Sequence, residues 1–162
     1  MKQLDIYGDN RYENYTKTRV GCRGIVTDNG KILVSFEEKT DYWLLPGGGL
    51  ENGETEEGCC MREILEETGY IIKPVKQFLT INEYYEDYKY VSHYFICEIV
   101  GMGRQKLTAS ETERGLIPKW LAIQDFVKTV ADYQAYAQIN EDKKGSYLRE
   151  YTALCEYIRT TV

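Results

Sequence analysis

Three glutamates, Glu63, Glu66 and Glu67, have a spacing that suits metal chemistry. In a helix they would occupy positions i, i+3 and i+4 and share one face, within an arc of about 100°. Like charges this close repel each other, and a hard divalent cation removes the repulsion because Mg²⁺ and Mn²⁺ prefer carboxylate oxygens. A solvated acidic helix face explains the same residues equally well. The choice between these interpretations depends on the residues that precede them.

A glycine-rich loop at residues 48–54 leads into this segment, and the expected signals mark both ends of a helix. Thr55 is a predicted N-cap, followed by acidic residues that suit the positive end of the helix dipole, and Gly69 is a predicted stop. Arg62 lies four residues before Glu66 and can pair with it. The segment is therefore predicted to be a loop followed by an amphipathic helix. Its predicted buried side carries Met61, Ile64 and Leu65.

The stretch from Gly48 to Tyr70 has the pattern G-x₅-E-x₇-R-E-[apolar]-x-E-E-x-G-[bulky], with seven fixed identities over 23 residues. This pattern resembles the signature of the Nudix hydrolase family, and the preceding sequence WLLPGGG resembles the usual family lead-in. Tyr70 departs from the family, which usually has an aliphatic residue at this packing position. The matching residues are Gly48, Glu54, Arg62, Glu63, Ile64, Glu66, Glu67, Gly69 and Tyr70.

The resemblance implies hydrolysis of a small-molecule nucleoside diphosphate derivative, with Mg²⁺ or Mn²⁺ as cofactor. Glu63, Glu66 and Glu67 would hold one or more cations, which would bridge to the pyrophosphate oxygens of the substrate. Such a cation lowers the pKa of bound water and stabilises charge on the transferring phosphoryl group. Arg62 would orient Glu66. Glu54 would anchor the loop or support a metal through water.

A general base is also required for this reaction. Some Nudix enzymes use a glutamate of the signature and others a glutamate from a later loop, so both kinds of position are candidates. Within the signature the candidates are Glu63 and Glu67. In the later loop they are Glu111 and Glu113. We prefer Glu113 of this second pair because it lies nearer to the strand that contains Trp120.

Three further residues are candidates for contact with the substrate. Gly48 and Gly49 allow the backbone to bend tightly and to approach the helix closely. Arg23, on the first long predicted strand, could reach phosphates, although an ordinary surface arginine is the commoner case. His93, the single histidine, is predicted to be a core or pocket-wall residue rather than a catalytic base.

Tyrosines are concentrated between residues 84 and 94, where five occur. Among them, Tyr88 fits a tyrosine position of the Nudix dinucleoside polyphosphate hydrolases. With so many tyrosines nearby this match has little weight, and most of them are predicted to pack against the sheet rather than to stack on a base. Trp43 and Trp120 are likewise predicted to be core residues.

Two other functions fit part of the sequence. A catalytically silent Nudix-fold module, which binds a nucleotide or regulates a partner, would be expected to have lost a metal glutamate, and all three are present. The second is an unrelated acidic cation-binding protein. The spacing between the glycine-rich loop and the acidic helix argues against it, because such a protein would not require that spacing. The favoured function is therefore a pyrophosphohydrolase acting on a nucleoside triphosphate or a similar compound, and the silent module is the alternative.

Composition excludes several other classes. A net charge of −6 and a pI near 5.0 argue against a broad nucleic-acid-binding surface. The five cysteines contain no C-x-x-C pair, so we predict reduced core thiols and a cytoplasmic location. No apolar run approaches the length of a membrane span, so no membrane partner is expected. The N-terminal arm and the C-terminal helices could form a homodimer contact.

The pattern of strands and helices predicts an α+β fold in a single domain over residues 1–162. The family resemblance implies an α/β/α sandwich with a mixed sheet. Residues 1–17 would be an arm or an edge strand, and residues 122–162 would be additional C-terminal helices.

Asp28-Asn29-Gly30 predicts a hairpin turn. Residues 83–87 are predicted to form an acidic, tyrosine-rich turn and residues 101–115 a polar loop. Ile32, Val34 and Phe36 alternate with polar neighbours. The last predicted helix carries an apolar stripe of Leu148, Tyr151, Leu154, Cys155 and Ile158. Predicted strands cover residues 18–27, 31–36, 42–45, 70–72, 75–81, 89–100 and 119–121; predicted helices cover 123–139 and 146–160.

Overall fold

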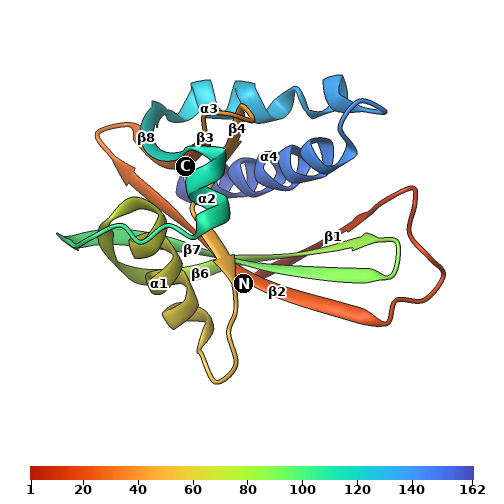
Figure 1. The fold of residues 1–162 in the computed structure, drawn as a ribbon, viewed down its shortest axis with the longest axis horizontal. Helices are drawn as coiled ribbons and strands as arrows, with labels where there is room; N and C mark the ends of the chain where they lie inside the picture. Colours follow the sequence, from red (N-terminus) through yellow and green to blue (C-terminus); the bar gives the residue numbers. More distant parts are fainter.

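A long mixed sheet with helices on both faces makes up the computed structural model, which describes residues 1–162 (Figure 1). The strands are β1 (Lys2–Tyr7), β2 (Lys17–Asp28), β3 (Lys31–Glu37), β4 (Tyr42–Leu44), β5 (Gly47–Gly49), β6 (Tyr70–Tyr85), β7 (Tyr88–Met102) and β8 (Leu116–Ala122). The helices are α1 (Glu56–Thr68), α2 (Ala109–Arg114), α3 (Ile123–Ala131), the 3₁₀ helix η1 (Tyr133–Tyr136) and α4 (Glu141–Thr161). Helix α1 lies on one side of the sheet and α3 and α4 on the other, which confirms the predicted α/β/α order.

The strand order places the glycine-rich loop against the middle of the sheet. The order is β1-β6-β7-β2-β3-β4, with β5 paired to β2 and β8 paired to β3. Strand β1 is parallel to β6 and β7 is parallel to β2, whereas the remaining pairs are antiparallel. Strand β5 pairs with residues Gly21–Arg23 of β2. The start of the loop is therefore fixed to the central strand β2 before the chain turns into α1.

Two hydrophobic cores lie on the two sides of the sheet. The core under α1 contains Cys22, Val26, Leu33, Cys59, Cys60, Ile64, Ile72, Phe95 and Cys97. The core under α3 and α4 contains Ile25, Ile32, Val34, Leu45, Phe78, Leu79, Ile81, Tyr94, Phe126, Val130, Tyr147, Ala153 and Leu154. Strand β3 contributes to both cores, so Leu33 is as fully buried as Ile32 and Val34. The predicted alternation along this strand is therefore absent.

Local signals in the sequence are confirmed at the helix and turn boundaries. The side chain of Thr55 caps α1 by accepting a hydrogen bond from the Gly58 N–H. Gly69 ends the helix in the left-handed conformation, with φ of 80°. Asn29 and Gly30 have φ values of 48° and 75° and form the turn between β2 and β3. Strand β1 occupies one edge of the sheet.

Several boundaries differ from the sequence prediction. The segment expected to be a loop over residues 101–115 contains α2, because Thr108 and Glu111 form a capping box that starts a short helix. The helix expected to reach residue 139 ends at Ala131 and is followed by η1. Met61, expected to be buried, is exposed, because Cys59, Cys60 and Ile64 form the buried side of α1.

Helix α4 differs in both its start and its buried side. It begins at Glu141 rather than near residue 146. Of the predicted apolar stripe Leu148, Tyr151, Leu154, Cys155 and Ile158, only Leu154 is buried. The buried residues of the helix are Lys143, Tyr147, Glu150, Ala153, Leu154 and Glu156. Helical periodicity was predicted correctly, but the phase was wrong because charged and hydroxyl side chains of α4 face the sheet.

All five cysteines are free thiols. Cys22, Cys59, Cys60 and Cys97 are buried, as predicted, whereas Cys155 is exposed on α4. None of the helices combines the length and the apolar composition that a membrane span requires.

Candidate active site

Glu67 is a buried carboxylate with hydrogen bonds but no ion pair. Its side chain lies at the C-terminal end of α1 and the residue is 8% exposed. Oε2 accepts hydrogen bonds from Ser35 Oγ at 2.7 Å and from the Gly47 N–H at 3.2 Å. Burial raises the pKa of Glu67 to about 8, although these hydrogen bonds and the charge of Arg23 act to lower it. An uncompensated buried acid of this kind would gain from a bound cation.

Glu63 and Glu66 lie beside Glu67 on the same helix and share one arginine. Arg62 Nη1 donates to Glu63 Oε1 at 2.8 Å and to Glu66 Oε2 at 3.2 Å. Burial raises the pKa of Glu63, and the neighbouring charge of Glu66 adds to the effect. Gly48 faces the Glu63 carboxylate so closely that a Cβ at this position would overlap it. The glycine loop and the acidic helix are thus in direct contact at Glu63.

Arg62 joins the helix to the loop as well as to its neighbouring glutamates. Its Nε and Nη2 donate to the two carboxylate oxygens of Glu54 at 2.7 and 3.0 Å, a two-pronged pair. Nη2 also donates to the Gly49 carbonyl at 3.0 Å. The guanidinium of Arg62 lowers the pKa of Glu54 to about 2. The predicted pair with Glu66 is present, but the shortest hydrogen bond anchors the loop through Glu54.

Arg23 extends from β2 toward the segment Leu45–Gly47, here named the lead-in segment, which follows β4 and ends in the first residue of β5. Its Nη1 donates to the Leu45 carbonyl at 3.0 Å. Its side chain is 17% exposed and close enough for its charge to lower the pKa of Glu67. Gly47 has φ of 155°, and a Cβ there would overlap the Cys22 carbonyl and Arg23. Arg23 and the glycines are therefore packed together beside Glu63, Glu66 and Glu67, the three glutamates of the signature, which we call the box carboxylates.

The two glutamates outside the signature occupy different positions on α2. Glu113 is exposed and makes no hydrogen bond or ion pair with the box carboxylates. Glu111 Oε1 accepts a hydrogen bond from the Thr108 N–H at 2.8 Å, and its charge adds to the rise in the pKa of Glu63. The structure thus brings Glu111, rather than the preferred Glu113, into electrostatic range of the site.

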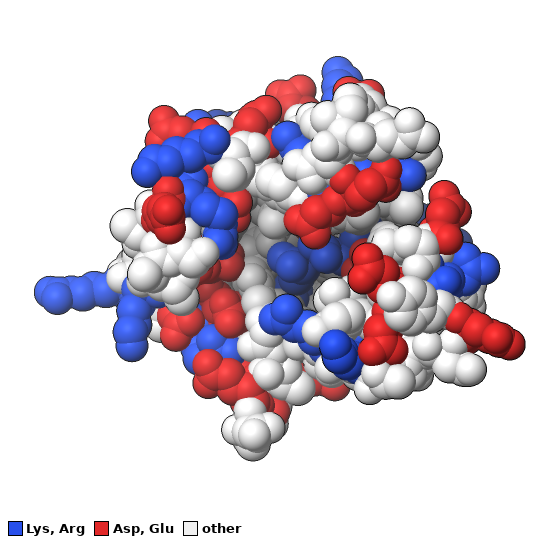
Figure 2. All heavy atoms as spheres, turned by 45° about the vertical axis from the view of Figure 1, so that its right-hand side comes forward, with Lys and Arg blue, Asp and Glu red and all other residues white.

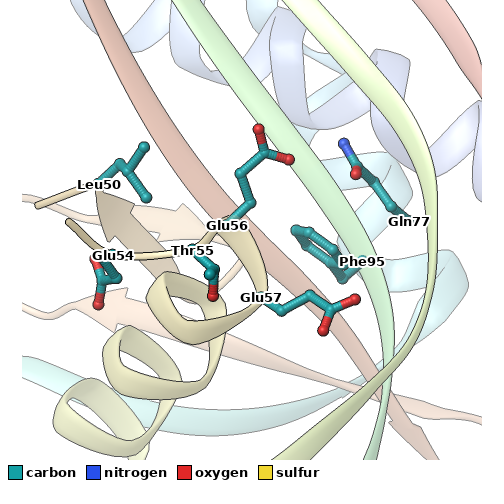
Figure 3. A pocket seen from close by; sticks show the side chains of 7 residues that line it. All are labelled: Leu50, Glu54, Thr55, Glu56, Glu57, Gln77 and Phe95. Carbon is teal, nitrogen blue, oxygen red and sulfur yellow. The ribbon is translucent and has the colours of Figure 1, made fainter. Parts of the chain in front are cut away.

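A separate hollow of about 420 Å³ lies at the other end of α1 (Figure 3). Its lining consists of Leu50, Glu54, Thr55, Glu56, Glu57, Gln77 and Phe95. His93 lies nearby, with Nε2 3.2 Å from Glu56 Oε1 and Nδ1 within hydrogen-bond distance of Thr80 and Gln77. Of the residues that match the signature pattern, only Glu54 lines the hollow. Glu63, Glu66 and Glu67 do not line this hollow.

The tyrosine cluster lies away from the carboxylates. Tyr84 and Tyr88 are at the end of the β6–β7 hairpin, which Figure 1 shows at the opposite end of the sheet from α1. They help to line a pocket of about 450 Å³ together with Tyr7, Arg11, Tyr12, Glu13, Tyr15 and Glu86. Tyr94 instead lies fully buried under α4. Tyr88 is therefore not positioned beside the box glutamates.

A buried charged network between α4 and the sheet was not predicted from the sequence. Arg149 lies 3.1 Å from Glu150 and 3.6 Å from Glu83. Glu83, expected to lie in a turn, is in β6 and buried, and its Oε2 has no hydrogen-bond partner. Figure 2 shows Lys and Arg atoms on the floor of a hollow below the helical layer. The available signal was the spacing of Lys143, Tyr147 and Glu150 at i, i+4 and i+7.

The box carboxylates suit a magnesium-type cation in their chemistry. No three Asp, Glu, His or Cys side chains converge tightly enough to form a complete cage. Mg²⁺ does not require such a cage, because it keeps several waters and is commonly held by one or two carboxylates together with substrate phosphates. The buried, unpaired carboxylate of Glu67, beside Glu63 and Glu66, supplies oxygen donors and a need for positive charge. The donor set therefore fits the group.

Comparison with known families identifies the domain that carries this site. The model of the NUDIX domain matches residues 16–141, which is most of the chain. The chain belongs to the NUDIX domain family. Members of this family generally use divalent metal ions, in agreement with the carboxylate donors described above.

Individual relatives of this NUDIX chain have several different names. An RNA pyrophosphohydrolase of Baumannia cicadellinicola subsp. Homalodisca coagulata is 40% identical over 68 residues, covering 42% of each protein. An ADP-ribose pyrophosphatase of Bacillus subtilis (strain 168) is 28% identical over 141 residues, covering 83% of this chain and 71% of the relative. The chain thus spans less than half of the first relative's length.

Solved structures support the fold assignment. A NUDIX hydrolase from Nitrosomonas europaea has a TM-score of 0.59 at 21% identity, and the match covers 85% of this chain and 90% of that one. At this identity the likeness concerns the fold alone. It extends over most of both chains, so the arrangement of sheet and helices is shared nearly throughout.

Proposed function

We propose that this NUDIX chain is a pyrophosphohydrolase that uses Mg²⁺ or Mn²⁺ to cleave small nucleoside diphosphate derivatives. The observation that carries the proposal is the contact between a glycine loop and three crowded carboxylates, one of them buried without a cationic partner. An acidic chain with a net charge of −6 needs local positive charge to accept a pyrophosphate. The pyrophosphatase and pyrophosphohydrolase names of the relatives support the same reaction class.

Glu63, Glu66 and Glu67 would hold the metal ion. When bound, the ion would lower the pKa of a coordinated water and offset charge on the phosphoryl group. Arg62 would keep Glu63 and Glu66 in place and fix the loop through Glu54. The glutamates would thus bind the metal ion, and Arg62 would orient the glutamates.

The remaining roles belong to groups around the carboxylates. The glycine loop at Gly48 and Gly49 would leave room for the pyrophosphate near Glu63, and Arg23 would offer its charge to the phosphates from β2. Glu67 or Glu63 would accept the proton from the attacking water. Outside the signature, Glu111 replaces Glu113 as the candidate, because its charge acts on Glu63. We place the protein in the cytoplasm, and the four buried cysteines, none of them in a C-x-x-C pair, support this location.

A substrate panel tests the proposal against the silent binding module. The panel contains nucleoside triphosphates, ADP-ribose, dinucleoside polyphosphates and a 5′-triphosphorylated RNA oligonucleotide, each assayed with and without Mg²⁺. We expect Mg²⁺-dependent release of phosphate or a nucleotide product from at least one compound. Glu63→Gln should lower that rate by about 100-fold or more, whereas Glu57→Gln, an exposed change on the same helix, should leave it unchanged. Binding without turnover across the panel would establish the silent module instead.

A further inference from the structure

Glu150, on the C-terminal helix α4, is a fully buried carboxylate that holds the backbone next to the glycine loop. The residue has 0% exposure. Its Oε2 accepts a hydrogen bond from the Leu45 N–H at 2.8 Å. Its Oε1 accepts hydrogen bonds from Arg149 Nε at 3.1 Å and from the Tyr94 hydroxyl at 3.2 Å. Both oxygens are thus satisfied, and one of them acts on the lead-in segment.

Side chains hold three polar groups of the lead-in backbone. Glu150 binds the N–H of Leu45, and Arg23 binds the carbonyl of Leu45 at 3.0 Å. Two residues later, the Gly47 N–H donates to Glu67 Oε2 at 3.2 Å. A short stretch of backbone, two residues long, therefore connects the carboxylate of α4 to the most buried carboxylate of α1. A shift of Leu45 would move the Gly47 N–H and alter the surroundings of Glu67.

Neighbouring residues of α4 hold the strand just before this segment. The Tyr147 hydroxyl accepts a hydrogen bond from the Trp43 N–H at 3.2 Å and donates to the Asp41 carbonyl at 3.3 Å. Lys143 Nζ lies 3.9 Å from Asp41 Oδ2. We name these three side chains, Lys143, Tyr147 and Glu150, the α4 latch. They lie about one helical turn apart on α4. Going along the helix, they contact Asp41, then Trp43 and then Leu45, which is the order in which the chain leads to the glycine loop.

A charged latch is not needed for stability alone. Well-packed apolar side chains commonly serve as well as a buried ion pair, whereas hydrogen bonds to a carboxylate impose direction and distance. Here the carboxylate sits between Arg149 and Arg23, with Arg23 Nε at 3.9 Å. Compared with an apolar side chain, the Glu150 carboxylate additionally fixes the position of the Leu45 N–H.

We propose that Glu150 is a positioning residue for the active site: it fixes the lead-in segment from α4 and thereby sets the backbone that contacts Glu67. This inference rests on the proposed function for its activity readout. The position of the segment is also measurable without any substrate, through the exchange rates of the Leu45 and Gly47 amide hydrogens.

Two substitutions at Glu150 separate positioning from general packing. Glu150→Leu removes both acceptors, and we expect kcat to fall about tenfold or more, KM to change less than about threefold, and Leu45 amide exchange to accelerate about tenfold or more. Glu150→Gln retains one carbonyl acceptor, so it should recover most of the exchange protection and lose only about threefold in kcat, because a neutral hydrogen bond is weaker.

Glu156 supplies the matched control. It is also buried on α4, but it pairs with Lys2 at 2.8 Å and Arg159 at 2.7 Å rather than with the lead-in segment. Glu156→Leu and Glu156→Gln should lower stability without changing kcat or the exchange of Leu45 and Gly47 in the folded protein. Equal loss of kcat in the Glu156 variants would show a general packing effect and overturn the proposal.

Other outcomes also decide the question. A Glu150→Leu variant with kcat within about twofold of the parent, or with unchanged Leu45 exchange, overturns the proposal. If that variant does not fold, Glu150→Gln decides: faster exchange at Leu45 supports positioning, and unchanged exchange and kcat contradict it. If the parent cleaves nothing on the substrate panel, the proposed function fails, while the exchange rates still determine whether Glu150 holds the segment.

Discussion

Two buried glutamates, Glu67 on α1 and Glu150 on α4, contact the same short stretch of backbone from opposite sides. Glu67 accepts from the Gly47 N–H and Glu150 from the Leu45 N–H. Glu150 is paired with Arg149 and lies close to Arg23. Glu67 has a serine hydroxyl as its side-chain partner and other glutamates as neighbours on its helix. Both carboxylates are buried, but only Glu150 has an arginine as a hydrogen-bond partner.

The difference indicates separate roles for the two residues. A compensated carboxylate such as Glu150 has its charge balanced within the protein and serves to hold structure. An uncompensated one such as Glu67 stores an electrostatic cost that a bound cation would relieve. The contrast therefore separates Glu67, proposed to bind the metal, from Glu150, proposed to position the backbone beside Glu67. The two glutamates bind the N–H groups of Leu45 and Gly47, the residues on either side of Pro46.

The largest expected effect comes from Glu67→Gln. Its amide oxygen can still accept from Ser35 and Gly47, but the charge proposed to bind metal is gone. We expect kcat to fall by about 10³-fold. The metal-free variant should be at least as stable as the parent at neutral pH, because the parent must keep Glu67 protonated on folding and the glutamine need not. Steady-state kinetics and urea unfolding measure the two quantities. A large loss of stability would show that Glu67 is compensated after all.

A smaller effect is expected from Gly48→Ala. The added Cβ would displace the Glu63 carboxylate, the mobile end of a side chain, so activity should fall by about 10- to 100-fold with little change in stability. Gly101→Ala is the matched control, since it lies outside the glycine loop and a Cβ there meets only the Ile71 side chain at 3.6 Å, an ordinary contact. Activity assays and thermal unfolding compare the two variants. Equal activity in both would remove Gly48 from the site.

Ser35→Ala should have a more modest effect. It removes the hydroxyl that donates to Glu67 Oε2 at 2.7 Å and leaves the backbone donor of Gly47 in place. We expect kcat to fall about three- to tenfold and stability to fall by about 1 kcal/mol. The kinetic constants and the free energy of unfolding of the variant provide the measurement. No change in kcat would indicate that Ser35 only fills space.

The most gradual effect is a pH dependence of stability in the metal-free protein. The pKa of Glu67 is raised from 4.5 to about 8 in the folded state, so the folded protein retains a proton that the unfolded chain has released. The free energy of unfolding should therefore decrease as pH rises from about 5 to about 8. Urea titrations across this range measure the slope. Glu67→Gln should reduce it and Glu57→Gln should not; an unchanged slope in both would contradict the assignment.

Much of the fold and of the α1 site could be predicted from the sequence because their signals are local. The cap at Thr55, the stop at Gly69 and the spacing of the three glutamates all lie within a few helical turns. Helix α2 was missed because the polar segment has no apolar period, and only its capping box marks it.

The α4 latch could not be predicted in the same way. Lys143 and Glu150 resemble solvent-exposed residues unless the strand opposite them is known, and that strand is about a hundred residues away in sequence. Glu83 was placed in a turn for the same reason, since its neighbours are tyrosines and acids and only the pairing of β6 with β7 places it inside. The burial of these charged residues therefore depends on contacts between segments distant in sequence, which local sequence patterns do not reveal.

Direct titration with Mn²⁺, followed by the electron paramagnetic resonance signal of the free ion, tests the central claim. The parent protein is predicted to bind Mn²⁺. Glu67→Gln should bind it about tenfold or more weakly, whereas Glu150→Gln should bind it as the parent does. Equal Mn²⁺ affinity in the parent and in Glu67→Gln would contradict the assignment of the buried, uncompensated carboxylate as a metal ligand.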